Sequence, residues 1–123
     1  MDTPSTLKEE LAAIDIRVAE LKENIKLGEA LARLHEEPDF MHVILNAYLE
    51  KEADRLFGVL TTPSYLKRDV MENIMDKLTT IRNVKQFFVT VIQNANMAQE
   101  QIDEEEDLRK EITARDTQGD TDG

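Results

Sequence analysis

The chain contains no cysteine and no tryptophan, and its 123 residues include only four glycines and three prolines. Without cysteine, disulfide bonds, thiolate metal ligands and cysteine nucleophiles are excluded. No apolar run approaches the roughly 20 residues needed to cross a bilayer, and the first residues lack the basic, then apolar pattern of a secretory signal. These absences predict a cytoplasmic protein that does not contact a membrane.

The sequence also lacks the usual motifs of nucleophilic catalysis and of phosphate binding. There is no G-x-S-x-G sequence and no glycine-rich loop that could hold a phosphate. The acidic run Asp103–Asp107 lacks the glycine and the alternating ligands of a calcium loop, and we interpret it as a solvated helix end. We therefore expect no enzyme activity, no catalytic residues, no bound metal and no cofactor.

What the chain does contain favours helices, because Ala, Leu, Glu, Lys and Gln are abundant. Each proline, at positions 4, 38 and 63, precedes a run with helical periodicity. Proline is well tolerated at the first position of a helix, where its missing N–H would have no partner. The sequence therefore predicts three helices.

The first predicted helix covers residues 5–35. Its apolar residues alternate in spacings of four and three, as in a coiled coil; they are Leu7, Leu11, Ile14, Val18, Leu21 and Ile25. Gly28 occupies the next position of this pattern and predicts a kink, a hinge or a break into two helices. The apolar seam could pair with another subunit or lie on the core of its own chain.

The second and third predicted helices cover residues 38–60 and 63–112, and the short link between them predicts an antiparallel hairpin. The predicted apolar face of the second helix is Phe40, Val43, Ile44, Ala47, Leu56 and Leu60, widened by Leu45, Leu49 and Phe57. The third helix would be roughly 65–75 Å long, about twice the second. Its apolar stripe is Val70, Ile74, Leu78, Ile81, Val84, Phe88, Val91, Ala95, Ala98 and Ile102. The far half of this stripe needs cover from the first helix, from another subunit or from solvent.

The predicted fold is all-α: a long antiparallel helical hairpin at residues 36–112, with an N-terminal amphipathic helix at residues 1–35 as a docking or oligomerisation arm. Residues 113–123 have no apolar periodicity and predict a disordered acidic tail. We expect a coiled-coil-like homo-oligomer that also binds other proteins. The predicted interaction residues are Leu11, Ile14, Val18, Leu21, Ile25, Phe88, Ile92, Ala95, Ala98 and Ile102.

The formal charge is −11, and it is concentrated near the end of the chain. Residues 100–123 carry ten acidic and three basic residues. This sign disfavours direct binding to nucleic acid and suits a basic partner protein or mimicry of DNA.

Both histidines lie in the stretch HEEPDFMH, residues 35–42. A zinc-protease motif places two histidines four residues apart on one helix, whereas these are seven apart with Pro38 between them. The favoured interpretation is a helix junction, with His35 at the negative end of one helix and Glu37 or Asp39 at the positive end of the next. A metal site is the alternative.

Two stretches, EPDFMHVILNAYLEKEADRLFGVL and IRNVKQFFVTVIQNANMAQEQI, carry a resemblance. Over residues 34–102 the chain resembles small acidic all-helical proteins encoded by tailed bacteriophages in the virion assembly gene region. The resemblance implies a structural or assembly role in the host cytoplasm or in the virion, and it brings no catalytic residues with it. The alternative is an acidic DNA-mimic inhibitor of a host nucleic-acid-binding protein.

Overall fold

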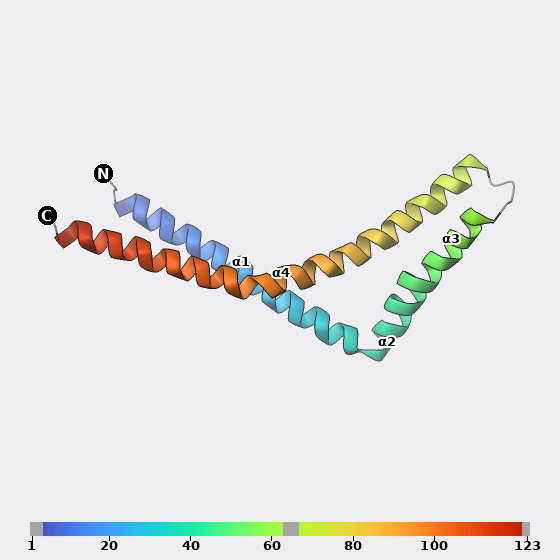
Figure 1. Ribbon diagram of the computed structural model, residues 1–123, viewed down its shortest axis with the longest axis horizontal. Helices are drawn as coiled ribbons and strands as arrows, with labels where there is room; N and C mark the ends of the chain where they lie inside the picture. The colour runs from blue at the N-terminus through green and yellow to red at the C-terminus, as the bar shows by residue number, and fades with distance from the viewer. Residues whose placement is uncertain (1–3, 63–66, 122–123) are drawn as a thin grey trace. The chain divides into compact units, whose positions relative to one another are not determined.

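The computed structural model describes the backbone of residues 4–62 and 67–121, and the side chains of residues 6–62 and 67–117. These residues form three continuous helical runs and contain no strand (Figure 1). In chain order the elements are α1 (Pro4–Glu36), then α2 (Pro38–Phe40), η1 (Met41–Glu52) and α3 (Ala53–Thr61) in one run, then α4 (Arg68–Thr121). The predicted all-α fold with three helices is confirmed.

The break between α1 and α2 falls at Glu37, whose backbone is extended at φ −77° and ψ 121°. The Glu37 carboxylate accepts a hydrogen bond of 2.8 Å from the backbone N–H of Phe40, and Pro38 occupies the first turn. An acidic N-cap satisfies one orphan N–H and favours the positive end of the new helix. The predicted helix junction is thus found at this position.

Gly28 does not interrupt α1, so the predicted break into two helices there is wrong. A glycine inside a helix costs about 1 kcal/mol relative to alanine but keeps its backbone hydrogen bonds. The apolar pattern resumes within the same helix at Leu31, which is buried. Packing of the residues before and after Gly28 therefore outweighs the low helix propensity of glycine.

The last helix differs from its predicted bounds at both ends. Its predicted start at Pro63 lies outside the described residues, and α4 begins at Arg68. It continues to Thr121, so the predicted end at Ile112 is too early, and residues 113–121 are helical where the sequence predicts a disordered tail. No proline or glycine occurs between Arg68 and Gln118, so no residue forces the helix to stop.

Two compact units make up the chain, and they do not follow the predicted boundaries at residues 35 and 112. In the first unit, residues 4–29 of α1 pack antiparallel against residues 93–121 of α4 (Figure 1). Its core contains Ile14, Val18, Ile102 and Ile112, with Leu7, Leu11, Leu21, Ile25 and Leu108 packed against them. The far half of the long apolar stripe is therefore covered by the first helix of the same chain.

The second unit, Ala30–Ile92, contains the hairpin predicted from the proline positions. Its core is formed by Leu49, Leu56, Ile74 and Ile81. Partly buried side chains around them include Ile44, Tyr48, Leu60, Leu78, Val84 and Phe88. The predicted stripe of the third helix is confirmed from Ile74 to Ile102, whereas Val70 is exposed.

The second helical run contains a long π-helical segment, η1, and this changes which residues face the core. In an α-helix, a step of four residues overshoots a full turn by about 40°. The wider π-helix has i to i+5 hydrogen bonds and more residues per turn, so residues four or five positions apart lie on the same face. The core-facing residues are accordingly Phe40, Ile44, Leu45, Tyr48, Leu49, Glu52, Ala53, Leu56 and Leu60. Val43 and Ala47, which the sequence places on the apolar face, are exposed.

Candidate functional site

The ten predicted interaction residues lie mainly inside the single chain. Those on α1 pack against α4 in the first unit, and Ala98 and Ile102 are buried. Phe88 and Ala95 are half-buried. Of these ten residues, Ile92 alone is exposed. The seam that the sequence assigns to an interface is thus already occupied in cis.

Charged residues lie within the packed seam of the first unit. Glu105 and Arg109 continue the spacing of three and four that links Ile102 to Ile112, and both are partly buried. The Nε of Arg17 donates to Oε1 of Glu105 at 2.8 Å, whereas Oε2 of Glu105 is buried without a hydrogen-bond partner. The sequence interpretation of this acidic run as a wholly solvated helix end is therefore wrong for Glu105.

A second cation in the same unit is held by two carboxylates. Arg109 donates to Oδ1 of Asp15 on α1 at 2.5 Å and to Oε2 of Glu106 on its own helix at 3.1 Å. The hydrogen bond from Asp15 raises the pKa of Arg109, and the hydrogen bond from Glu105 raises the pKa of Arg17. Ion pairs at such positions select one register of two helices. They hold α1 on α4.

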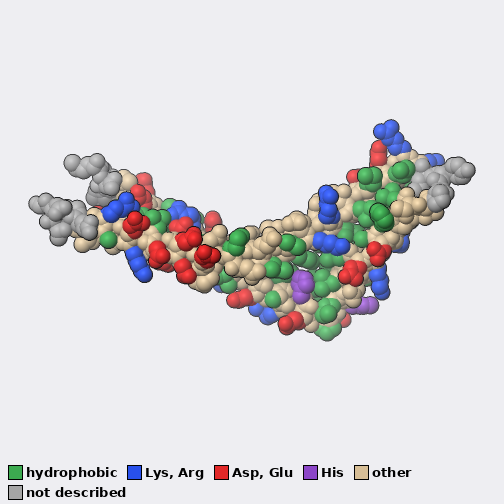
Figure 2. Space-filling model, viewed as in Figure 1, with side chains coloured by type: hydrophobic (Ala, Val, Ile, Leu, Met, Phe, Trp, Pro, Cys, Tyr) green, Lys and Arg blue, Asp and Glu red, His purple; other side chains and the backbone are tan. Residues whose placement is uncertain are grey.

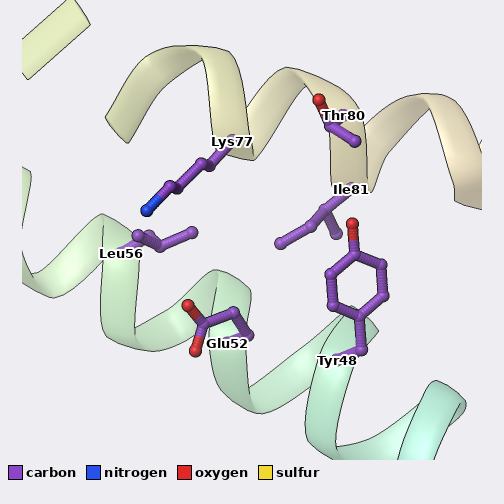
Figure 3. A pocket seen from close by; sticks show the side chains of 6 residues that line it. All are labelled: Tyr48, Glu52, Leu56, Lys77, Thr80 and Ile81. Atoms are coloured by element: carbon purple, nitrogen blue, oxygen red, sulfur yellow. The ribbon is translucent and has the colours of Figure 1, made fainter. Parts of the chain in front are cut away.

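A shallow pocket of about 290 Å³ lies in the second unit (Figure 3). One wall comes from η1 and α3 and the other from the first half of α4. Its lining residues are Tyr48, Glu52, Leu56, Lys77, Thr80 and Ile81. Sequence reasoning missed Tyr48 and Glu52 because α-helical periodicity places them off the apolar face.

Glu52 is the acidic group of this pocket, and Arg55 holds it from the same helical run. The Nε of Arg55 lies 3.0 Å from Oε2 of Glu52, and Nη2 lies 2.5 Å from Oε1. The hydrogen bonds from Arg55 lower the pKa of Glu52, and the charge of Lys77 lowers it further. Glu52 is therefore an ionised carboxylate at neutral pH and is unsuited to act as a general acid.

The two histidines have different surroundings. Nδ1 of His35 lies 2.9 Å from the backbone oxygen of Leu31, and its ring packs at 5.5 Å from the rings of both Phe40 and Phe88. His42 is exposed on η1. In the described part of the chain, no three His, Asp or Glu side chains converge in a way that could hold a metal ion. His35 packs as part of the helix junction.

Across residues 4–62 and 67–121, no helix is long and apolar enough to cross a membrane.

No protein family model matches the chain, and the searches of curated proteins and of solved structures also gave no match.

The outer surfaces of the two units differ in character. The second unit carries nine acidic and eight basic residues, so nearly all of the net charge of −11 belongs to the first. Acidic side chains gather over the first unit on the face shown in Figure 2. Most of the exposed large hydrophobic residues belong to the second: Leu34, Met41, Val43, Phe57, Val70, Met71, Met75, Phe87, Val89 and Ile92. These exposed apolar side chains are the strongest candidates for contact with a partner.

Proposed function

We propose that the protein is a non-enzymatic structural or assembly protein that acts by binding copies of itself and other proteins through helical faces. The bacteriophage particle is the context that the sequence resemblance implies, and virion proteins are the proposed partners. No direct binding to nucleic acid is expected, because the net charge is −11.

The observation that carries this proposal is the balance of exposed and buried apolar groups. Among the described residues, more large hydrophobic side chains are exposed than hydrophobic side chains are buried. Helices packed in pairs cover only one stripe each, and exposed apolar side chains that lie in a row along a helix are suited to protein–protein contact. Helical faces that remain uncovered in one chain are suited to bind further helices.

Sedimentation equilibrium of the full chain over a wide range of concentration tests the proposal. A particle mass that rises above the 14.1 kDa of one chain would support self-association. Binding of the purified chain to purified virion proteins, measured by the same method, tests the wider role. A chain that stays monomeric throughout and binds no virion protein would refute the proposed function.

The charge of the first unit favours a second candidate, an acidic mimic of DNA that inhibits a host nucleic-acid-binding protein. Its α4 segment includes the run Asp103–Asp107, and its carboxylates outnumber its cations by ten. A mimic should compete with DNA for one purified host protein, with an affinity that falls as salt rises. Binding that is unaffected by added DNA would exclude this candidate.

A further inference from the structure

A second heptad pattern runs along α4 beside the packed one. We call it the α4 outer seam; its residues alternate in spacings of four and three, and they are Met71, Met75, Leu78, Arg82, Lys85, Val89 and Ile92. All are exposed except Leu78, which is half-buried. Such spacing keeps a stripe straight along a coiled-coil partner. Among the described residues, α4 therefore has one stripe packed in its own chain and a second that is exposed except at Leu78, which also contacts the core of the second unit.

The central part of α4 is also free of acidic side chains. Residues 77–99 contain no Asp or Glu and three cations, two of which, Arg82 and Lys85, stand in the middle of the α4 outer seam. Apolar residues flank them on both sides. A helix that fits this stripe must present apolar residues at its two ends and carboxylates at its centre.

The first helix of the chain offers such a stripe on the side away from its packed seam. We call it the α1 outer seam; its residues, in spacings of three and four, are Ala13, Ile16, Glu20, Glu23, Leu27, Ala30 and Leu34. Ala13 is half-buried and the others are exposed, Ile16 by 60%. The two acids lie at its centre, with apolar residues on both sides.

The two outer seams match residue by residue when the helices run antiparallel. Glu23 then faces Arg82 and Glu20 faces Lys85, so opposite charges meet at the centre. The other facing pairs are all apolar: Leu34 with Met71, Ala30 with Met75, Leu27 with Leu78, Ile16 with Val89 and Ala13 with Ile92. A parallel alignment would instead place Leu34 against Asn96, so the antiparallel one is favoured.

We propose that the α1 outer seam of one copy of this chain docks antiparallel on the α4 outer seam of a second copy. This inference rests on the proposed function and names the partner and both surfaces. Within one chain, Asp15 and Arg17 are ion-paired with Arg109 and Glu105, so this part of α1 already packs against a later segment of α4 than the α4 outer seam.

Two like outer seams are poor partners for each other. Pairing of two α4 outer seams about their centre would set Arg82 against Lys85, and pairing of two α1 outer seams would set Glu20 against Glu23. Like charges in such positions disfavour the wrong partner. The contact therefore joins two different surfaces. Two copies can make it twice and form a closed dimer, or successive copies can make it once each and form a head-to-tail chain.

Charge exchange tests this pairing with the full chain. One double variant carries Arg82→Glu and Lys85→Glu, and the other carries Glu20→Lys and Glu23→Lys. Each alone should weaken self-association at least about tenfold, because both facing pairs become repulsive. An equimolar mixture of the two should recover it, since every contact between the two variants again joins opposite charges.

Matched controls separate this effect from a general change of charge or a loss of folding. Lys22→Glu with Lys51→Glu, and Glu29→Lys with Glu50→Lys, make the same changes in net charge at exposed positions outside both outer seams. Both controls should associate like the unmodified chain. Circular dichroism should show the same helical content in all variants, because every substituted side chain is exposed.

The outcomes distinguish this inference from the function on which it rests. Weakened single variants with a recovered mixture support the pairing. Variants that associate normally, or weakened variants whose mixture does not recover, overturn the pairing while self-association itself remains. An unmodified chain that is monomeric at every concentration also overturns the pairing, and the proposed function then fails only if virion proteins are not bound either.

Discussion

The Nε of Arg17 lies 2.8 Å from Oε1 of Glu105, although 88 positions of sequence separate the two residues. This ion pair joins α1 to the far part of α4 and, with the pair of Arg109 and Asp15, fixes their antiparallel register. The remaining oxygen of Glu105 is buried and has no hydrogen-bond partner. A site that specifies register therefore also carries an energetic cost.

That cost predicts the effect of Glu105→Leu. Removal of a carboxylate with a buried, unpartnered oxygen from an apolar seam should raise the free energy of unfolding by about 1 kcal/mol. Chemical denaturation followed by circular dichroism measures the change. Glu104→Leu, at the exposed neighbouring position, is the matched control and should have little effect. A loss of stability in Glu105→Leu would mean that the pair with Arg17 outweighs the buried oxygen.

Ile14 and Ile16 are only two residues apart in sequence but lie on opposite sides of α1. Ile14 has no exposed surface, and Ile14→Ala should lower the free energy of unfolding by roughly 2–5 kcal/mol. Ile16 is 60% exposed, so Ile16→Ala should leave that free energy nearly unchanged while it weakens self-association. Denaturation and sedimentation of both variants measure the two effects. Equal losses of stability would contradict the assigned faces of α1.

Glu52 should titrate below its ordinary range because Arg55 donates hydrogen bonds to it. A lowered pKa in the folded state means that this pair stabilises the fold at pH values above the ordinary pKa of the carboxyl. That stabilisation is lost as the pH falls through the lowered pKa. Arg55→Met should return the pKa of Glu52 towards its ordinary value, as measured by an NMR titration of its side chain. Lys77→Met should produce a smaller shift, since Lys77 acts only through its charge.

Gly58 lies inside α3 without any structural need for glycine. A methyl group at its Cα would meet no atom within 4 Å. Gly58→Ala should therefore raise the free energy of unfolding by roughly 0.5–1 kcal/mol, because alanine loses less backbone entropy in a helix. The midpoint of chemical denaturation reports the change. An unchanged or lower midpoint would show that the end of α3 is not fully helical in solution.

Local signals in the sequence predicted much of the fold. Pro38, together with the acidic residues beside it, gave the position of the helix junction, and apolar spacing gave the packed stripe of α4 from Ile74 to Ile102. Both depend on neighbours within one or two helical turns. The sequence could not show that the far half of α4 packs against α1 of the same chain, because a heptad seam can pair equally well with a helix of a second copy.

The candidate site was harder to predict. Tyr48 and Glu52 lie on the core-facing side of the π-helical η1, whereas the apolar face predicted from α-helical periodicity includes Val43 and Ala47 instead. Glu105 belongs to a run of acids that looks solvated throughout, and its burial depends on α1 lying across it. In both cases the deciding contact comes from a residue distant in sequence.

The pairing of residues 4–29 with residues 93–121 has a consequence for synthesis on the ribosome. The second unit, Ala30–Ile92, is contiguous and can fold as soon as it emerges, whereas residues 4–29 must wait until residues 93–121 have been made. During that interval the apolar stripe of residues 4–29 lacks the segment on which it packs. The second unit can therefore fold before the first, although half of the first is made earlier.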